Sequence, residues 1–240
     1  MTAAGAPGVR GAWVLAAVTG LLAGAIAATV MLTRDDGPTA PEPVSRVRTV
    51  FVGDSVTRGF DPTTLAADDA TSWVTYALPD PRSPWFLDSN AAVAGRTLAE
   101  MQAAFATDVL AHDPAGVVIL GGTNDALRRV PPDQSAAALR AMVEAAQSAG
   151  IEVWVVSPPP LDPATGVTIQ PTLAAEAQVA AELGVPFVDL TPSLSTGDGH
   201  WQPGLTTDGV HPTPAGAQRL ADAVLQQVGL AATGPGPVDQ

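Results

Sequence analysis

Short apolar runs alternate along the chain with segments in which apolar residues recur at helical spacing. The apolar runs predict strands at residues 48–53, 85–95, 115–125, 151–156 and 185–190. The intervening segments predict helices at residues 72–78, 97–112, 132–149, 171–183 and 213–228. Strands that alternate with helices are typical of a parallel sheet that is covered on both faces. The pattern therefore predicts an α/β fold, a three-layer α/β/α sandwich around about five parallel strands.

Capping residues mark two of the predicted helix starts. Thr97 is followed three residues later by Glu100, which is the spacing of a capping box. Thr213 precedes Pro214, and proline suits the first position of a helix because its missing N–H would have no partner there. His211 should consequently lie just outside the N-terminus of the last helix.

The N-terminal part of the chain differs in composition from the remainder. Residues 11–32 carry no charge and are long enough to span a bilayer as a helix, which takes about 20 residues. We expect a transmembrane anchor there. A cleavable signal peptide is the alternative, because Ala25, Ile26 and Ala27 resemble a cleavage site. Both alternatives place the rest of the chain outside the cytoplasm, either anchored to the membrane or secreted.

The remaining segments follow from proline content and apolar periodicity. A proline-rich linker separates the apolar segment from the predicted domain, and the polar C-terminus lacks periodicity. We expect five segments. They are a short N-terminal segment (1–10), the anchor or signal peptide (11–32), the linker (33–47), a catalytic domain (48–229) and a flexible tail (230–240).

Composition and charge narrow the class of function. Of the 240 residues, 46% are hydrophobic and 15% are charged, which is typical of a folded domain. The formal net charge of −13, without a single lysine, argues against a nucleic-acid partner, since phosphates are bound by basic surfaces. The chain has no cysteine, which excludes cysteine nucleophiles, thiolate metal sites and disulfide bonds. We expect no cofactor and a monomeric protein.

A nucleophile and a base are predicted at the ends of the strands. Ser55 follows the first strand in Gly-Asp-Ser, and open α/β sheets bind their ligands at the carboxyl ends of the strands. The helix that follows His211 disfavours an imidazolium, so this ring can accept the serine proton. Asp208, three residues earlier, can hold the other ring nitrogen in the required tautomer. In isolation, Ser55 would also fit an ordinary turn and Asp208 a helix cap.

Ester hydrolysis also needs hydrogen-bond donors for the oxyanion of the tetrahedral intermediate. Asn124, in the segment Gly-Gly-Thr-Asn-Asp, offers a side-chain amide at the end of the third strand, although an asparagine there would also suit a turn. Gly95 offers a backbone N–H at the end of the second strand, and Ser55 offers its own N–H. The expected oxyanion hole is formed by Ser55, Gly95 and Asn124.

Together these motifs resemble the SGNH (GDSL-type) hydrolase family. The four blocks of the family occur in order as GDSVTRG, NAAVAGRT, GGTND and DGVHPTPAG, within residues 50–220. The resemblance implies a flavodoxin-like α/β/α sandwich and the hydrolysis of esters. It also implies that Ser55 is the nucleophile, His211 the base and Asp208 its orienting partner, and that the donors named above complete the oxyanion hole.

Other acidic and histidine side chains have alternative explanations. Asp54 and Asp125 are expected to bond local backbone groups and to hold their loops. A metal site would have to use Asp54, Asp208, His200 and His211. The sequence has no dense ligand spacing, so we do not predict a metal site.

Two long loops with proline and glycine, at residues 157–171 and 191–207, follow the fourth and fifth predicted strands, and such loops usually set specificity. In the second loop, Trp201 is a candidate substrate contact that would stack on a sugar or cover an acyl group. The alternative is that Trp201 anchors its loop by burial.

The placement outside the cytoplasm suggests an acylated substrate of the cell envelope. We expect a serine esterase that removes O-acetyl or other short acyl groups from a carbohydrate through an acyl-serine intermediate. A lipase or lysophospholipase activity and a glycan O-acyltransferase are the enzymatic alternatives, since the same serine chemistry serves all of them. A tethered glycan-binding or scaffold protein is the non-enzymatic alternative, but a binding protein has no need of a base and oxyanion donors together.

Overall fold

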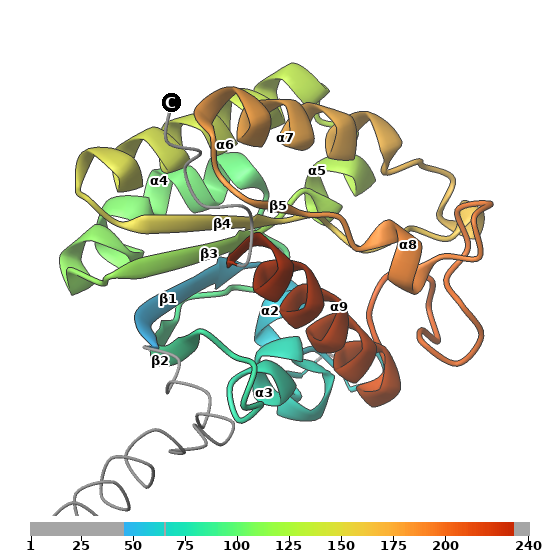
Figure 1. Ribbon diagram of the computed structural model, residues 1–240. Helices are drawn as coiled ribbons and strands as arrows, with labels where there is room; N and C mark the ends of the chain where they lie inside the picture. Colours follow the sequence, from blue (N-terminus) through green and yellow to red (C-terminus); the bar gives the residue numbers. More distant parts are fainter. Residues whose placement is uncertain (1–45, 65, 233–240) are drawn as a thin grey trace, which may run out of the picture. The chain divides into compact units, whose positions relative to one another are not determined.

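Five parallel strands form the central sheet among the residues that the structure describes. The computed structural model describes residues 46–64 and 66–232, which all belong to a unit spanning residues 44–240. The strand order is β2-β1-β3-β4-β5 (Figure 1), the order of flavodoxin-like folds. The strands are β1 (Val47–Gly53), β2 (Trp85–Asn90), β3 (Gly116–Leu120), β4 (Glu152–Val156) and β5 (Phe187–Val188).

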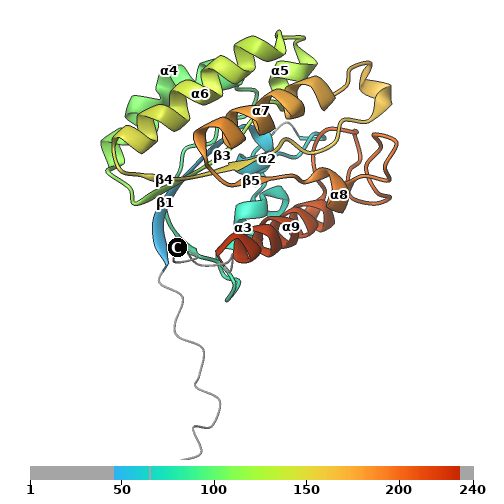
Figure 2. The same ribbon diagram turned by 45° about the horizontal axis from the view of Figure 1, so that its top comes forward.

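Helices cover both faces of the sheet (Figures 1 and 2). One face packs against α4 (Leu98–Asp108), α6 (Pro132–Ser148) and α7 (Gln170–Leu183). The other face packs against α3 (Trp73–Ala77) and α9 (Pro214–Ala232). The predicted three-layer α/β/α sandwich is confirmed.

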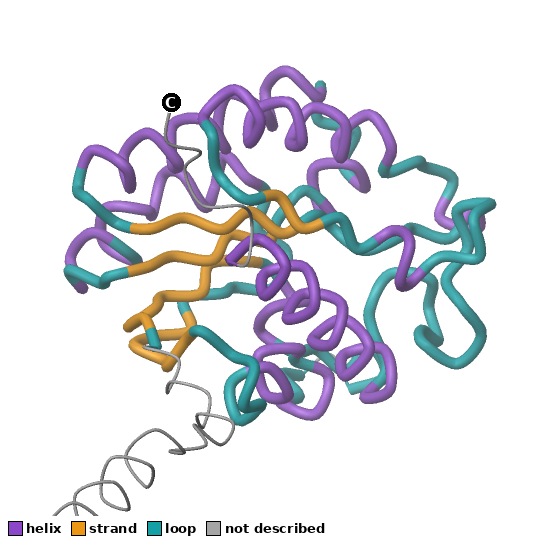
Figure 3. Tube along the Cα trace, in the orientation of Figure 1, coloured by secondary structure: helices purple, strands orange, loops and turns teal. Residues whose placement is uncertain are grey.

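Short helical turns lie in the connections between the strands and the longer helices, and Figure 3 distinguishes helices, strands and loops by colour. Three short α-helices follow β1, β3 and β5, and three 3-10 turns lie in the connections. They are α2 (Ser55–Arg58), α5 (Thr123–Leu127), α8 (Thr191–Leu194), η1 (Asp69–Thr71), η2 (Leu110–His112) and η3 (Pro163–Thr165).

The strands are continuously apolar because helices bury both of their faces. In β3, Val118 and Leu120 belong to the cluster on the α9 face, whereas Val117 and Ile119 pack on the α4 and α6 face. The side chains of a strand alternate between the two faces, so neither face tolerates a polar residue here. The indole rings of Trp73, Trp85 and Trp154 are buried on the α9 face.

The predicted helix caps are present. The Thr97 hydroxyl accepts a hydrogen bond from the Glu100 N–H at 3.3 Å, and the Glu100 carboxylate accepts one from the Thr97 N–H at 2.8 Å. At the start of α9, the Thr213 hydroxyl accepts a hydrogen bond from the Gly216 N–H at 3.1 Å. The helix predicted at 97–112 is divided, because α4 ends at Asp108 and the turn η2 continues the chain to residue 112.

Two strands end earlier than the sequence predicts. β2 ends at Asn90 rather than near residue 95, because the Asn90 side chain accepts a hydrogen bond from the Ala92 N–H at 3.1 Å and turns the chain. β3 ends at Leu120, so the prediction that residues 121–125 continue this strand is wrong. Gly122 has φ +96°, a left-handed conformation that leaves the strand, and Thr123 begins α5.

The strand predicted at 185–190 is also shorter than expected. β5 contains only Phe187 and Val188, at the edge of the sheet. The next N–H, that of Asp189, donates to the Gln227 side chain of α9 at 3.1 Å. The chain therefore leaves the sheet early and turns into α8.

Among residues 46–64 and 66–232, no helix combines the length and hydropathy that crossing a bilayer requires. The predicted anchor or signal peptide at 11–32 lies outside the described residues, as do most of the linker and the last residues of the tail.

Candidate active site

The end of β1 fixes the position of the predicted nucleophile. Asp54 is the N-cap of α2, and its Oδ1 accepts a hydrogen bond from the Val56 N–H at 2.9 Å, as expected for a carboxylate that bonds local backbone. Ser55 is the first residue of α2, and 6% of its surface is exposed. Gly59 ends this helix with φ +84°, where a Cβ would lie only 2.1 Å from the Asp68 carbonyl oxygen. The cap and the glycine together hold Ser55 at the carboxyl edge of the sheet.

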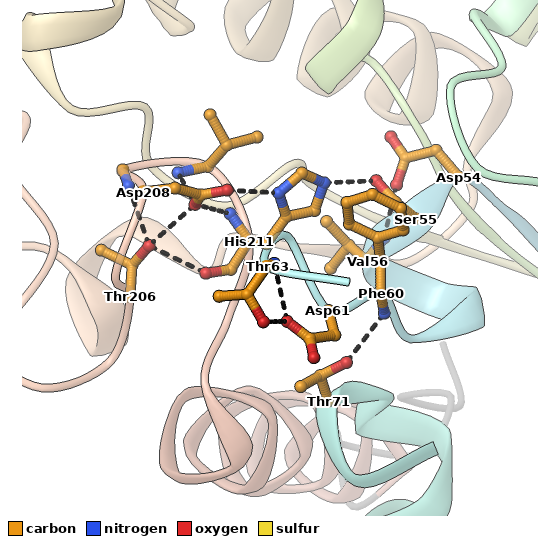
Figure 4. Close-up of polar contacts among 12 residues, drawn as sticks. Asp54, Ser55, Val56, Phe60, Asp61, Thr63, Thr71, Thr206, Asp208 and His211 are labelled. Atoms are coloured by element: carbon orange, nitrogen blue, oxygen red, sulfur yellow. Dashed lines mark hydrogen bonds and ion pairs between the residues drawn. The ribbon is translucent and has the colours of Figure 1, made fainter. Parts of the chain in front are cut away.

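The loop before α9 brings His211 to this serine (Figure 4). Nε2 of His211 lies 3.0 Å from Oγ of Ser55, and Nδ1 lies 2.7 Å from Oδ2 of Asp208. When Nδ1 donates its proton to the carboxylate, Nε2 presents a lone pair to the serine hydroxyl. The structure thus brings together the three residues predicted as nucleophile, base and orienting acid.

A tight turn holds Asp208 and His211 as one unit. Oδ1 of Asp208 accepts hydrogen bonds from the N–H groups of Val210 at 2.9 Å and His211 at 2.8 Å. The Thr206 hydroxyl donates to the His211 carbonyl at 2.8 Å and accepts from the Gly209 N–H at 3.0 Å. Burial alone would raise the pKa of Asp208, but the hydrogen bonds from the His211 ring and from the backbone outweigh it and hold this pKa well below its usual range. The carboxylate consequently stays ionised.

An aromatic ring packs on the histidine. The ring centroids of Phe60 and His211 are 4.6 Å apart with an interplanar angle of 41°. The Phe60 N–H donates to the Thr71 hydroxyl at 2.8 Å, which ties this residue to the turn η1 (Figure 4). The sequence analysis assigned no role to Phe60. The available signal was an aromatic residue directly after the glycine that ends the serine motif.

The predicted amide donor lies next to the nucleophile, but its hydrogens are engaged. Asn124 is the second residue of α5, and its Nδ2 donates to Oδ2 of Asp54 at 3.2 Å and to the Arg96 carbonyl at 3.1 Å. These bonds connect the loops after β1, β2 and β3 at one point. To stabilise an oxyanion at Ser55, the Asn124 amide would have to exchange one of these partners for the substrate oxygen.

Gly95, the other predicted donor, lies in the turn between β2 and α4. Its φ is +83°, and its carbonyl accepts a hydrogen bond from the Arg128 guanidinium at 2.6 Å. The next residue, Arg96, provides the carbonyl that binds the Asn124 amide. These hydrogen bonds join the loop after β2, which contains Gly95, to the segment after β3, which contains Asn124.

Behind these loops lies a group of buried carboxyl groups, which the sequence analysis did not foresee as a group. Burial raises the pKa of Asp54 from 3.8 to about 6, partly opposed by the hydrogen bond from Val56 and the nearby His211. Asp125 accepts hydrogen bonds from the Leu98 N–H at 3.0 Å and from the Ser135 hydroxyl at 2.8 Å. Asp125 thereby ties α5 to the start of α4 and to α6, so its partners are distant in the sequence and not the local backbone groups that were expected.

Glu176, on α7, is the third buried carboxyl group. It is 1% exposed, and its Oε1 has no hydrogen-bond partner within the described part of the chain. Burial, followed by repulsion from Asp125 and Asp54, raises the pKa of Glu176 well above its usual range. The signal in the sequence was its helical spacing from the buried Thr172 and Ala180.

Two further predictions concern metal binding and Trp201. Among residues 46–64 and 66–232, no group of three or more histidine and acidic side chains is arranged to hold a metal ion. The predicted substrate contact of Trp201 is not supported, because the residue is 4% exposed and belongs to the core cluster on the α9 face. The backbone N–H of Trp201 donates to Oδ1 of Asp162 at 2.9 Å. Trp201 thus anchors its loop by burial, which was the alternative.

Comparison with known proteins gives one family and many related structures. A family model described as the GDSL-like lipase/acylhydrolase family matches residues 51–219. A GDSL-like lipase from Bacteroides thetaiotaomicron is 26% identical, with a TM-score of 0.58, and the match covers 77% of this chain and 86% of that one. A search of the curated proteins gives no match.

Two other solved structures share the fold at lower identity. A lipase/acylhydrolase from Enterococcus faecalis is 23% identical, with a TM-score of 0.63 and coverage of 77% of this chain and 96% of that one. A catalytic mutant of an acetylxylan esterase from Geobacillus stearothermophilus is 24% identical, with a TM-score of 0.62 and coverage of 77% and 95%.

Proposed function

The chain belongs to the GDSL-like lipase/acylhydrolase family and is an ester hydrolase, and from this premise we propose that Ser55 removes acetyl or other short acyl groups from a carbohydrate of the cell envelope. The observation that carries the proposal is the unbroken hydrogen-bonded chain from Ser55 through His211 to Asp208, with distances of 3.0 Å and 2.7 Å. No other group is needed to activate the serine.

The first half of the reaction transfers the acyl group to the enzyme. Nε2 of His211 takes the proton from Oγ of Ser55 while Oγ attacks the ester carbonyl carbon, which forms a tetrahedral intermediate. The ionised Asp208 stabilises the resulting imidazolium through Nδ1. The imidazolium then gives its proton to the leaving alcohol oxygen, the carbon–oxygen bond of the ester breaks, and an acyl-Ser55 remains.

The oxyanion of the intermediate needs donors that are already in place. The N–H groups of Ser55 and Gly95 and the Nδ2 of Asn124 are the candidates, and one such donor contributes roughly 10²- to 10³-fold to kcat in serine hydrolases. Because the Asn124 amide binds Asp54 and Arg96 in this structure, its contribution requires that the substrate oxygen replace one of these acceptors.

The second half of the reaction releases the acid. A water molecule loses a proton to Nε2 of His211 and attacks the acyl carbonyl, and the proton then returns to Oγ of Ser55 as the acyl–oxygen bond breaks. The products are the free carboxylic acid and the deacylated alcohol. An acyltransferase would use a glycan hydroxyl in place of this water.

The N-terminal sequence supports a substrate of the cell envelope. The uncharged segment 11–32 favours export, where acylated envelope carbohydrates are accessible.

The test measures acid release by the full-length chain in detergent micelles. The substrates are p-nitrophenyl acetate, p-nitrophenyl palmitate and an O-acetylated oligosaccharide, each with the wild type, Ser55→Ala and the exposed control Ser148→Ala. We expect acetate release that disappears in Ser55→Ala and persists in Ser148→Ala, with little activity on palmitate. A preference for palmitate would indicate a lipase. Acetate release that Ser55→Ala leaves unchanged would rule out Ser55 as the nucleophile.

A further inference from the structure

The two long loops identified in the sequence enclose a cavity. The space has a volume of about 720 Å³. It is lined by residues 160, 161, 163 and 166–172 after β4, by residues 195 and 197–199 after α8, and by residues 129–132 after α5. Cavities of this size are typical of small-molecule sites. The loops extend beyond the carboxyl edge of the sheet, beside α5, α7 and α8 (Figures 1 and 3). This cavity is therefore on the side of the fold where the catalytic residues lie.

Two contacts fasten the loop after β4 to the turn that carries the catalytic histidine. The N–H of Asp162 donates to the Gly209 carbonyl at 3.0 Å, so the loop after β4 is fastened to the turn that carries His211. Val210, the residue before His211, packs against the buried Leu161 and its apolar neighbours. Because His211 must protonate the leaving oxygen, the alcohol half of an ester lies on the histidine side of Ser55, towards the loop after β4.

Arg129 lines the cavity in an unusual backbone conformation. Its φ is +54°, which non-glycine residues rarely adopt and which often marks a functional position. Hydrogen bonds hold it there, since the Arg129 N–H donates to the Ala126 carbonyl at 3.0 Å and the Val130 N–H donates to the Asp125 carbonyl at 2.9 Å. The backbone of α5 and its following turn thus fixes the root of the arginine side chain.

Most N–H donors of the Arg129 guanidinium have no hydrogen-bond partner among the described residues. Among the described residues, the guanidinium makes one hydrogen bond, a long contact of 3.4 Å from Nη2 to the carbonyl of Gly166, which also lines the cavity. Within residues 46–64 and 66–232, no carboxylate is close enough to form an ion pair with it. A guanidinium presents a planar fork of donors that matches a carboxylate. Since the whole chain carries a net charge of −13, an anionic ligand needs such a local cation.

The remaining lining suits a sugar. Asp198 lines the same cavity, and its Oδ1 accepts hydrogen bonds from the Thr196 hydroxyl and from the His200 N–H. These hydrogen bonds lower the pKa of Asp198, and the one from the Thr196 hydroxyl has the largest effect. The carboxylate therefore remains ionised and can accept hydrogen bonds from sugar hydroxyl groups. Val167 and Ile169 add apolar surface for a ring face. A carboxylate-bearing sugar would satisfy the cation, the acceptor and the apolar surface together.

We propose that this cavity is the subsite for the alcohol half of the substrate and that Arg129 binds the carboxylate of an acidic sugar residue in it. The inference rests on the proposed ester hydrolysis at Ser55 and deepens it by naming the class of carbohydrate, an acylated glycan that contains sugar acids.

The experiment compares two substrates that differ only in charge. They are an O-acetylated oligogalacturonate and the same oligosaccharide with its carboxylates converted to primary amides. Acetate release by the full-length enzyme gives the ratio of kcat/KM for the acidic over the neutral substrate. A ratio cancels any general loss of activity or folding in a variant. The variants are Arg129→Gln, Arg129→Lys and the control Arg140→Gln, which changes an exposed arginine of α6 paired with Glu182.

We expect the wild type to prefer the acidic substrate by about 5- to 20-fold, as for an exposed charge-assisted pair. Arg129→Gln should bring the ratio close to one, mainly through KM, Arg129→Lys should keep part of it, and Arg140→Gln should keep all of it. The preference should also weaken as salt is added. A wild-type ratio near one, or an unchanged ratio in Arg129→Gln, would overturn the inference.

A binding measurement separates this inference from the proposed hydrolysis. Calorimetric titration with the oligogalacturonate that carries no acetyl group reports the subsite without any turnover. If Ser55-dependent hydrolysis fails but this ligand binds the wild type and loses affinity in Arg129→Gln, the subsite stands and the reaction is wrong. If hydrolysis succeeds and this ligand binds both proteins equally, the reaction stands and the subsite is wrong.

Discussion

Gly122 is the position where a single added carbon should disturb the active site most. This residue ends the connection between β3 and α5, two residues before Asn124, with φ +96°. A Cβ placed on it would lie 2.2 Å from Oε1 of Glu176 and 3.0 Å from Cγ2 of Thr172. Both neighbours are at most 2% exposed, so neither side chain can move out into solvent. Gly122→Ala must therefore shift either the loop or α7.

The cost has two parts. An alanine in the left-handed region is destabilised by about 1–2 kcal/mol, and overpacking in a close-packed interior adds about 1–3 kcal/mol. We expect Gly122→Ala to lower the free energy of unfolding by about 2–5 kcal/mol. The loop shift should also displace Asn124, and a displacement of about 1 Å at a catalytic group can lower kcat by roughly 10²-fold.

Gly184→Ala is the matched control. Gly184 ends α7 with φ +66°, but nothing lies within 4 Å of its added Cβ, so this variant should lose only about 1–2 kcal/mol and keep its kcat. Urea unfolding followed by tryptophan fluorescence gives the stabilities, and p-nitrophenyl acetate hydrolysis gives kcat. In the double variant of Gly122→Ala and Glu176→Ala, the loss of unfolding free energy should be smaller than the sum of the losses in the two single variants. Equal losses for the two glycine variants, together with additivity in the double variant, would refute the contact with Glu176.

Two further predictions concern the acidic residues next to the nucleophile. Asp208→Asn should lower kcat on p-nitrophenyl acetate by roughly 10²- to 10⁴-fold, because an amide donor facing Nδ1 favours the wrong histidine tautomer; a loss below tenfold would contradict this role. Burial raises the pKa of Asp54 from 3.8 to about 6, so the folded state holds this proton more tightly than the unfolded chain does. Its stabilising contribution is complete below the unfolded pKa and is lost as the pH rises through the folded one, a change of about 3 kcal/mol. Relative to Asp54→Asn, the wild type should lose that much unfolding free energy between about pH 3 and pH 7 in urea titrations, whereas a constant difference would count against the buried carboxyl group.

The layers and the catalytic trio were accessible to sequence analysis because each depends on local patterns. Alternating apolar runs and helical periodicity are set by burial on both faces of a sheet, and Thr97 and Thr213 bond within their own helix starts. Asp208 and His211 lie in one turn, so their mutual geometry follows from their spacing. The contact of His211 with Ser55 then required only that both loops lie at the same edge of the sheet.

The features that the sequence did not predict depend on contacts between distant segments. In the sequence, Glu176 is an ordinary helical glutamate. Only the fold shows that Gly122, from another part of the chain, packs against its carboxyl group. The ring of Phe60 meets His211 across the fold, and the Asn124 amide joins the ends of two other strands. For Trp201 the sequence left burial and substrate contact open, because only the packing of its loop on the α9 face decides between them. No spacing rule within one segment reports such contacts.

The separation of the catalytic residues along the chain links activity to the completeness of folding. Ser55 and His211 are 156 positions apart, and every strand after β1 lies between them in the sequence. Oγ meets Nε2 only when α9 has docked on the sheet and has carried the preceding turn into place. A polypeptide that has formed β1 to β4 already possesses the nucleophile and much of the sheet, yet it has no base. Ester hydrolysis therefore reports that the last helix has docked on the sheet.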